Sequence, residues 1–122
     1  MQTVHPPVRV ELLPTVCGRF IALAMLDAER SLNSLTLAMV DALLPQLAEW
    51  ADDDRVLAVL LRGSGERAFC AGGDVRALTE FARTGNGDAG YPAHFFAREY
   101  RLDYAIRQFP KPLLVWGTGV VM

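Results

Sequence analysis

The feature that most constrains the fold is the run of residues 56–61, VLAVLL, which is apolar at every position. Near-continuous aliphatic strands of this kind are typical of parallel sheets that are covered on both faces. We therefore expect residues 56–61 to form a buried strand inside such a sheet. Parallel neighbours need long crossover connections, usually helices, so the rest of the chain should supply them.

Strands and helices do alternate along the chain. Residues 8–13 alternate apolar and polar side chains and residues 19–26 are apolar on both faces, which predicts a hairpin. The other expected elements are helix 36–51, a short apolar segment 68–71, helix 74–83, a flexible loop 84–90, helix 93–109 and strand 113–116. Pro45 should kink or break the first helix, at a cost of ~3 kcal/mol. This order predicts an α/β fold with a partly parallel sheet, in one domain that spans residues 1–122.

The composition excludes several classes of partner. The chain has 122 residues, 52% hydrophobic and 21% charged, which is typical of a globular domain. A net charge of -2 gives no basic field for nucleic acid, and the apolar runs are far shorter than the ~20 residues that span a membrane. Cys17 and Cys70 lie in apolar settings and predict buried free thiols, which, without a signal peptide, favour a cytoplasmic protein. The histidines and cysteines lack metal-ligand spacing, so no metal is expected.

A glycine turn, Gly72 and Gly73, separates the apolar segment from the expected helix 74–83. Glycines let a ligand approach the backbone, and the first amides of a helix lie at its positive end. We therefore expect a site for a developing negative charge at the Gly73 amide, with Asp74 as the helix N-cap. Residues 63–68 also spell a dinucleotide fingerprint, but that motif must open a helix, and here further glycines follow instead.

On the helix expected at residues 93–109, Glu99 falls within the apolar stripe, about 20° from Ile106 at ~100° per residue. A carboxylate on a buried face needs a partner or a role. One interpretation pairs it with Arg98 or Arg101, and the other gives it a ligand. Arg30, alone in its loop, could meet a phosphate or only water. The residues by themselves fit both a small-molecule enzyme and a ligand-binding module.

Four segments together resemble the enoyl-CoA hydratase/isomerase (crotonase) superfamily and, within it, the 3-hydroxyisobutyryl-CoA hydrolases. They are LNSL at residues 32–35, RAFCAGGDVR at 67–76, FFAREY at 95–100 and KP at 111–112. The resemblance implies a crotonase-like α/β spiral of stacked β-β-α turns, truncated here, that binds an acyl-CoA. It implies no cofactor, since coenzyme A enters as part of the substrate.

The resemblance also implies roles for particular residues. The Gly73 amide would be one of two oxyanion-hole donors to the thioester oxygen, and Glu99 would contact the substrate. The coenzyme A groove would be lined by Arg30, Ser31, Leu32, Ala71, Asp74 and Val75. The implied reaction is the thioester hydrolysis of valine catabolism.

Part of the family pattern would lie beyond residue 122, namely the second amide and the catalytic carboxylates. We therefore expect the chain to be the N-terminal part of such an enzyme, cut within its core and without turnover of its own. The residues at 116–118 also depart from those usual in the family before Gly119. Two alternatives stay open: an enoyl-CoA hydratase or isomerase, and a catalytically silent CoA-binding or assembly fragment. Family members often form trimers or hexamers, so a homo-oligomer is open as well.

Overall fold

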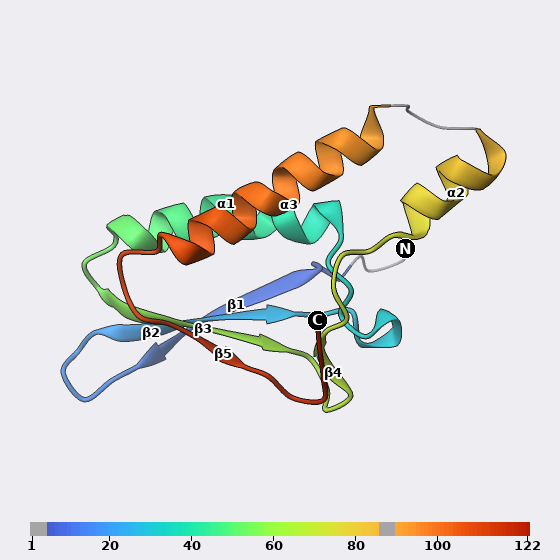
Figure 1. Cartoon of the computed structure of the whole chain (residues 1–122). Helices are drawn as coiled ribbons and strands as arrows, with labels where there is room; N and C mark the ends of the chain where they lie inside the picture. Colours follow the sequence, from blue (N-terminus) through green and yellow to red (C-terminus); the bar gives the residue numbers. More distant parts are fainter. Residues whose placement is uncertain (1–4, 86–89) are drawn as a thin grey trace.

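The protein folds as a mixed sheet with two long helices on one of its faces (Figure 1). The computed structural model describes residues 5–85 and 90–122, so part of the expected loop 84–90 lies outside it. The elements are β1 (Val8–Pro14), β2 (Phe20–Leu26), the short 3-10 helix η1 (Glu29–Ser31), α1 (Leu37–Asp52), β3 (Val56–Gly63), β4 (Ala68–Cys70), α2 (Arg76–Thr84), α3 (Tyr91–Arg107), β5 (Leu113–Trp116) and β6 (Val120–Val121).

The larger sheet has the strand order β1-β2-β3-β5. Its first pair is the predicted antiparallel hairpin, and β3 is parallel to both β2 and β5, as its aliphatic sequence predicted. The expected cover on both faces is not found among the described residues, because α1 and α3 both lie on the same face (Figure 1). On the other face Leu114 and Trp116 are 54% and 67% exposed.

Helix α1 is continuous through Pro45, so of the two expected effects of this proline, a kink or a break, the break is wrong. It begins where expected, with the Thr36 hydroxyl accepting a hydrogen bond from the Met39 amide at 3.2 Å. At its other end Lys111 Nζ donates to the carbonyl oxygens of Trp50 and Asp53, both at 2.6 Å. This cation compensates the negative end of the helix dipole, which the neighbouring aspartates would otherwise reinforce.

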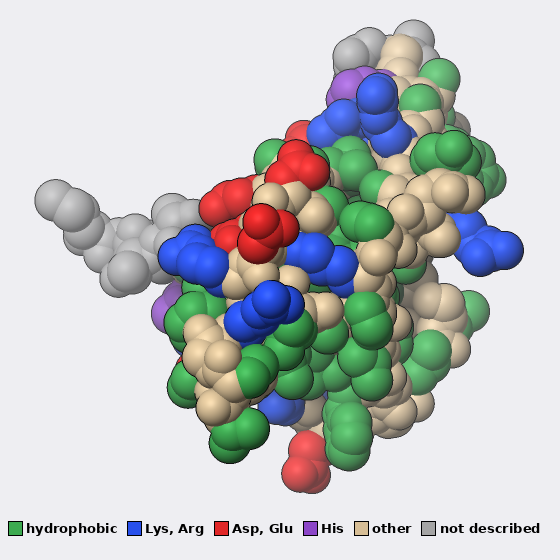
Figure 2. Space-filling model, turned by 90° about the vertical axis from the view of Figure 1, so that its left-hand side faces the viewer, with side chains coloured by type: hydrophobic (Ala, Val, Ile, Leu, Met, Phe, Trp, Pro, Cys, Tyr) green, Lys and Arg blue, Asp and Glu red, His purple; other side chains and the backbone are tan. Residues whose placement is uncertain are grey.

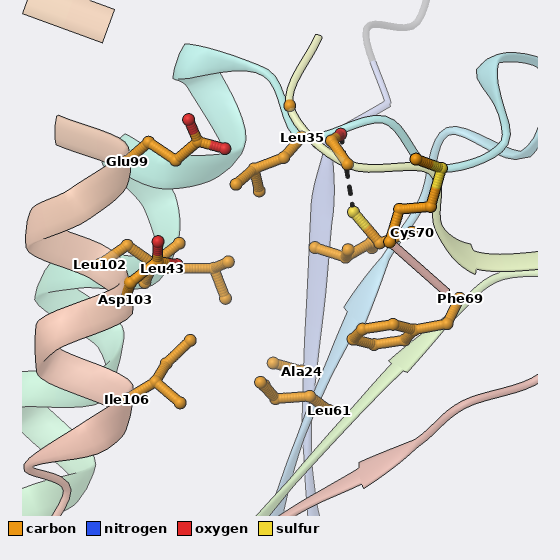
Figure 3. A pocket seen from close by; sticks show the side chains of 14 residues that line it. Ala24, Leu35, Leu43, Leu61, Phe69, Cys70, Glu99, Leu102, Asp103 and Ile106 are labelled. Atoms are coloured by element: carbon orange, nitrogen blue, oxygen red, sulfur yellow. Dashed lines mark hydrogen bonds between the residues drawn. The ribbon is translucent and has the colours of Figure 1, made fainter. Parts of the chain in front are cut away.

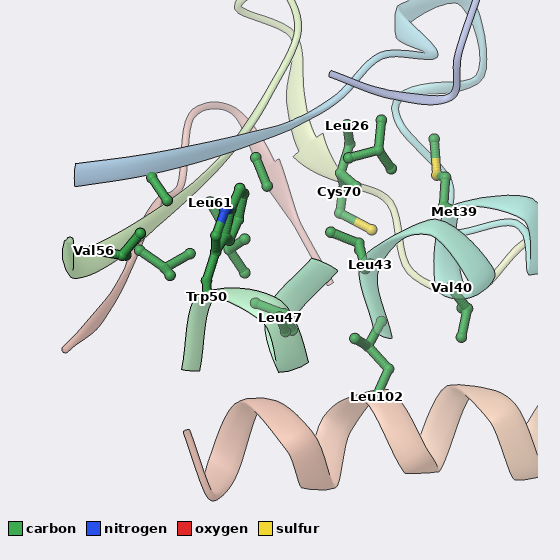
Figure 4. Close-up of a cluster of buried hydrophobic side chains, with 14 residues drawn as sticks. Leu26, Met39, Val40, Leu43, Leu47, Trp50, Val56, Leu61, Cys70 and Leu102 are labelled. Carbon is green, nitrogen blue, oxygen red and sulfur yellow. The ribbon is translucent and has the colours of Figure 1, made fainter. Parts of the chain in front are cut away.

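The core lies between the sheet and α1 and is closed by α3. Met39, Val40 and Val59 are fully buried, and Trp50 packs beside the strands (Figure 4). Leu102 points from α3 toward α1 in the same view. The arrangement fixes α3 against α1 and thereby sets where the remaining face of α3 points.

The surface mixes charges of both signs with apolar area. Figure 2 shows acidic and basic side chains intermingled above a group of hydrophobic ones. Within residues 5–85 and 90–122, no helix is long and apolar enough to cross a membrane. The same residues contain no group of three or more His, Cys, Asp or Glu side chains that could hold a metal ion. Both cysteines are free, but Cys17 is exposed in the β1–β2 turn, so its predicted burial is wrong.

Candidate functional site

The glycine turn runs alongside the segment that precedes α1. Leu35 and Gly73 form an isolated parallel bridge, in which the Leu35 amide donates to the Gly72 carbonyl and the Asp74 amide donates to the Leu35 carbonyl, both at 2.8 Å. Gly72 has a φ of 92°, a left-handed conformation that only glycine adopts readily. The turn is therefore held by backbone bonds on both sides of Gly73.

The bridge directs the Gly73 amide away from Leu35. In a parallel ladder, a residue bonds to the neighbours of its partner, while the partner's own amide and carbonyl point to the opposite side. Among the described residues the Gly73 amide donates no hydrogen bond. It is thus available to an acceptor outside this part of the chain.

The start of α2 differs from the prediction. The N-cap is Val75, not Asp74, and α2 begins at Arg76, so Gly73 does not belong to the first helical turn. Asp74 instead accepts from the Arg76 amide at 3.0 Å and pairs with its guanidinium at 2.6 Å. Hydrogen bonding by Arg76 lowers the pKa of Asp74. Glu80, one turn further along α2, pairs with Arg83.

An outer groove of about 360 Å³ lies along the glycine turn. Seven of the residues singled out from the sequence lie together in its lining: Arg30, Ser31, Leu32, Ala71, Gly73, Asp74 and Val75, with Ser34 and Arg76 completing it. The Arg30 side chain forms no ion pair within residues 5–85 and 90–122. The outer groove therefore offers an unpaired cation beside exposed backbone.

An inner pocket of about 380 Å³ lies on the other side of Gly73, between the sheet and α3 (Figure 3). Its wall is mostly apolar, and Figure 3 shows Leu35, Leu61, Phe69 and Ile106 around it. Glu99, which sequence reasoning singled out, reaches into it from α3. Gly73 lines both hollows and so marks their junction.

The Glu99 carboxylate lies directly against Gly73. A Cβ placed on Gly73 would come within 2.8 Å of Glu99 Oε1, so a side chain at this position would require the carboxylate to move. Burial raises the pKa of Glu99, and the nearby Asp103 carboxylate raises it further. The interpretation of Glu99 as an ion-pair partner is wrong, because Arg98 pairs with Asp41 at 2.8 Å and the described residues give Glu99 no salt bridge. Its acceptor oxygens face the inner pocket.

Sequence reasoning missed the structural part played by Asn33. Its side chain is completely buried and its φ is 54°. Asn33 Oδ1 accepts from the Ala28 amide at 2.8 Å, and Nδ2 donates to the carbonyls of Ser64 and Ala68 at 3.1 and 2.9 Å. Asparagine tolerates a left-handed backbone better than most residues, but that alone does not reveal partners more than thirty positions away.

The chain is similar to a known protein family, to known proteins and to solved structures. The profile of the enoyl-CoA hydratase/isomerase family matches residues 21–122. The mitochondrial 3-hydroxyisobutyryl-CoA hydrolase of Danio rerio is 39% identical over 97 residues, which are 80% of this chain and 25% of that protein. The small ribosomal subunit protein mS47 of Neurospora crassa is 34% identical over 90 residues, which are 74% of this chain and 18% of that protein. A solved carnitinyl-CoA dehydratase from Mycobacterium thermoresistibile matches with a TM-score of 0.82 at 39% identity, covering 97% of this chain and 32% of that one.

These matches confirm the predicted resemblance and the crotonase-like α/β fold. They also correct one prediction. The cytoplasmic location is wrong, because the hydrolase relatives are named as mitochondrial proteins. Unpaired cysteines and composition do not separate the cytosol from other reducing compartments. The chain spans only a quarter of the length of the hydrolase relative, so the activity of a whole protein is a separate question.

Proposed function

The chain belongs to the enoyl-CoA hydratase/isomerase family, and from that premise we propose that it is the acyl-CoA-binding part of a 3-hydroxyisobutyryl-CoA hydrolase-type thioesterase. The observation that carries the proposal is the junction at Gly73. There the Gly73 amide, which donates to no other described residue, lies between a groove that contains Arg30 and an apolar pocket that contains the Glu99 carboxylate. A long polar carrier with a short acyl group matches that division.

Coenzyme A would lie in the outer groove. Arg30 would meet one of its phosphates, as a charge-assisted donor, while the backbone of residues 71–75 would run along its pantetheine arm. The acyl group would enter the inner pocket, where Glu99 would accept a hydrogen bond from a polar substituent. The thioester itself would then lie at Gly73.

In the proposed reaction, water attacks the thioester carbonyl carbon and the carbonyl oxygen becomes an oxyanion. The Gly73 amide donates to that oxygen. Collapse of the intermediate breaks the carbon–sulfur bond and releases the acid and coenzyme A, whose sulfur takes up the proton that the water gave up. Acylation of a glutamate before water attack is the other route to the same products. One oxyanion-hole donor is typically worth ~2.7–4 kcal/mol at the transition state.

The groups that move the proton are not assigned to these 122 residues. Glu99 orients the substrate in this proposal, and we propose that the further carboxylates that the family resemblance implies come from sequence outside residues 1–122. We therefore expect the chain alone to release no thiol from 3-hydroxyisobutyryl-CoA above the uncatalysed rate. A rate well above that background would contradict this division of labour.

A second candidate is hydration or isomerisation of an enoyl-CoA. It is favoured by the match to a carnitinyl-CoA dehydratase at the same 39% identity as the hydrolase. Both reactions polarise a thioester carbonyl, so the Gly73 junction serves either. A third candidate, a silent CoA-binding or assembly piece, is consistent with the similarity to a protein named as a ribosomal subunit protein.

Calorimetry of the chain with 3-hydroxyisobutyryl-CoA tests the proposal. The wild-type chain should bind. Gly73→Pro should weaken binding about tenfold or more relative to Gly73→Ala, because both variants place a Cβ against Glu99 but only proline removes the amide donor. Arg30→Ala should weaken binding of coenzyme A itself, whereas the matched control Arg19→Ala, an exposed loop arginine outside both hollows, should not. No binding by the wild type would reject the proposal, and equal affinities of Gly73→Pro and Gly73→Ala would reject the role of the amide.

A further inference from the structure

We infer that Asn33 is the positioning residue for the Gly73 amide, an inference that rests on the proposed function of Gly73. Asn33 touches neither hollow. It belongs to the segment that both lines the outer groove and pairs with the glycine turn. Its side chain therefore acts on the site through the backbone.

The Asn33 side chain ties three backbone regions together. Its Oδ1 accepts from the Ala28 amide at 2.8 Å and from the Ser64 hydroxyl at 3.2 Å. Its Nδ2 donates to the carbonyls of Ser64 and Ala68 at 3.1 and 2.9 Å. One amide thus locks the segment after β2 to the turn between β3 and β4. The bonds to Ser64 and Ala68 are buried and the bond from the Ala28 amide is partly buried. In a buried setting an unmade bond costs about 1–3 kcal/mol.

Residues 32–35, which the Asn33 side chain holds in place, fix the position of Gly73 through backbone hydrogen bonds. Immediately around Asn33, the Leu32 carbonyl accepts from the Ala71 amide at 3.0 Å and Leu35 bonds to both neighbours of Gly73. Any shift of residues 32–35 against β4 therefore shifts the direction of the Gly73 amide. The same shift moves Arg30, Ser31 and Leu32 along the outer groove. Within residues 5–85 and 90–122, Asn33 is the one buried polar side chain that bonds both to the turn between β3 and β4 and to the start of η1.

The local geometry demands an asparagine. The side chain must donate two hydrogen bonds and accept two in one plane, which a carboxylate or a hydroxyl cannot do. The backbone is left-handed at φ 54°, which asparagine tolerates. Gly63 is matched to it, since a Cβ there would lie 2.6 Å from Asn33 Nδ2 and within 2.7 Å of the Ala68 carbonyl. Asn33 and Gly63 thus form one fitted pair.

The test compares Asn33→Asp with Val59→Ala, a core variant on β3 that is fully buried away from both hollows. Both variants should lose stability, so they serve as a matched pair under conditions in which each is fully folded. The amide resonance of Gly73 is recorded by NMR in the free chain, and the affinity for 3-hydroxyisobutyryl-CoA is measured by calorimetry. Asn33→Asp should move the resonances of Gly72, Gly73 and Asp74 and weaken binding about tenfold or more. Val59→Ala should leave those resonances in place and change affinity by less than about twofold.

Measurements of Asn33→Asp at several pH values separate an effect on the position of the Gly73 amide from a general loss of stability. The introduced carboxylate faces two carbonyls in a buried site, so its pKa should be raised. When protonated it regains one donor, and the Gly73 resonance should move back toward its wild-type position as the pH falls, relative to the wild type at each pH. Ser64→Ala, which removes only the hydroxyl bond to Oδ1, provides a milder variant if Asn33→Asp does not fold. It should move the Gly73 resonance in the same direction by a smaller amount.

The outcomes distinguish this inference from the proposed function. A Gly73 resonance unmoved in both Asn33→Asp and Ser64→Ala would overturn the inference, whatever the affinity. Equal effects of Asn33→Asp and Val59→Ala on Gly73 would also overturn it, since the role would then be stability alone. A moved resonance in a chain that binds no 3-hydroxyisobutyryl-CoA would support the positioning and reject the proposed function.

Discussion

At the scale of single residues, the site depends on the contact between Gly73 and Glu99. A methyl group on Gly73 would meet Glu99 Oε1 at 2.8 Å, so Gly73→Ala should displace the carboxylate and weaken acyl-CoA binding. Gly73→Ala should also lower the free energy of unfolding, and in a Glu99→Ala background, where the carboxylate is absent, that loss of stability should be smaller. In a double-mutant cycle read by denaturant unfolding, we expect a coupling of about 0.5–2 kcal/mol. Additive effects would show that the two residues do not interact.

The pKa of Glu99 gives a second prediction at this scale. Burial, reinforced by Asp103, raises it above its ordinary value. Between the unfolded and folded pKa values the native state binds more protons, so the contribution of Glu99 to stability falls as pH rises through that window. Glu99→Gln should therefore be more stable than the wild type at about pH 7, with the difference shrinking below about pH 4. Glu11→Gln, at an exposed carboxylate on β1, is the control. A wild type as stable as Glu99→Gln at both pH values would contradict the shift.

The residues differ in how far the sequence could predict them. Glu99 could be placed because one helix and its period decide which way a side chain points. Asn33 could not, since its partners Ser64 and Ala68 lie 31 and 35 residues away and only the folded chain brings them close. The direction of the Gly73 amide also depends on a long-range partner, Leu35. A local sequence pattern is enough to predict which face of a helix a side chain lies on. The direction of a backbone amide depends on strand pairing between distant residues, which a local pattern does not contain.

At the scale of elements, the end of α1 depends on Lys111, the only lysine of the chain. Its two charge-assisted bonds to carbonyls at 2.6 Å close the helix and anchor the connection into β5. Lys111→Met keeps the apolar stem but removes both bonds, so thermal and denaturant unfolding should show a loss of about 1.5–3 kcal/mol. Arg107→Met, at an exposed position near the end of α3, should cost less than about 0.5 kcal/mol. Equal losses would contradict the capping role.

Element types followed from the sequence more closely than element boundaries. The aliphatic run 56–61 correctly predicted that β3 has parallel neighbours, and Thr36 correctly predicted the start of α1. The start of α2 shifted to Arg76 because Asp74 binds the side chain and amide of Arg76 instead of capping the helix. Competing side-chain bonds of this kind decide a helix end, and the sequence alone does not rank them.

At the scale of the whole molecule, α1 and α3 cover one face of the larger sheet, and apolar side chains of β5 are exposed on the other face. Leu60 and Leu114 are paired neighbours on β3 and β5, and Arg62 pairs with Trp116 on the same side. Burial of that apolar area would be favourable at about 25 cal/mol per Å². The expected homo-oligomer remains a prediction, and sedimentation should show association that rises with concentration.

A charge on this face should weaken that association. Leu114→Lys should shift the chain toward the monomer, whereas Val16→Lys, at a fully exposed turn position off the sheet, should not. Identical sedimentation of both variants and the wild type would place any interface elsewhere.

We propose that the thioester carbonyl oxygen accepts a hydrogen bond from the Gly73 amide. The most direct measurement of this bond is the infrared stretching frequency of the thioester carbonyl. The substrate is 3-hydroxyisobutyryl-CoA labelled with a heavy carbon isotope at the thioester carbonyl. In the complex with the wild-type chain, the stretch should lie below its frequency in water, because a fixed donor in an apolar pocket polarises the bond more strongly than water does. It should return upward with Gly73→Pro. A carbonyl frequency at or above its value in water, in a wild-type chain that binds the compound, would contradict the account.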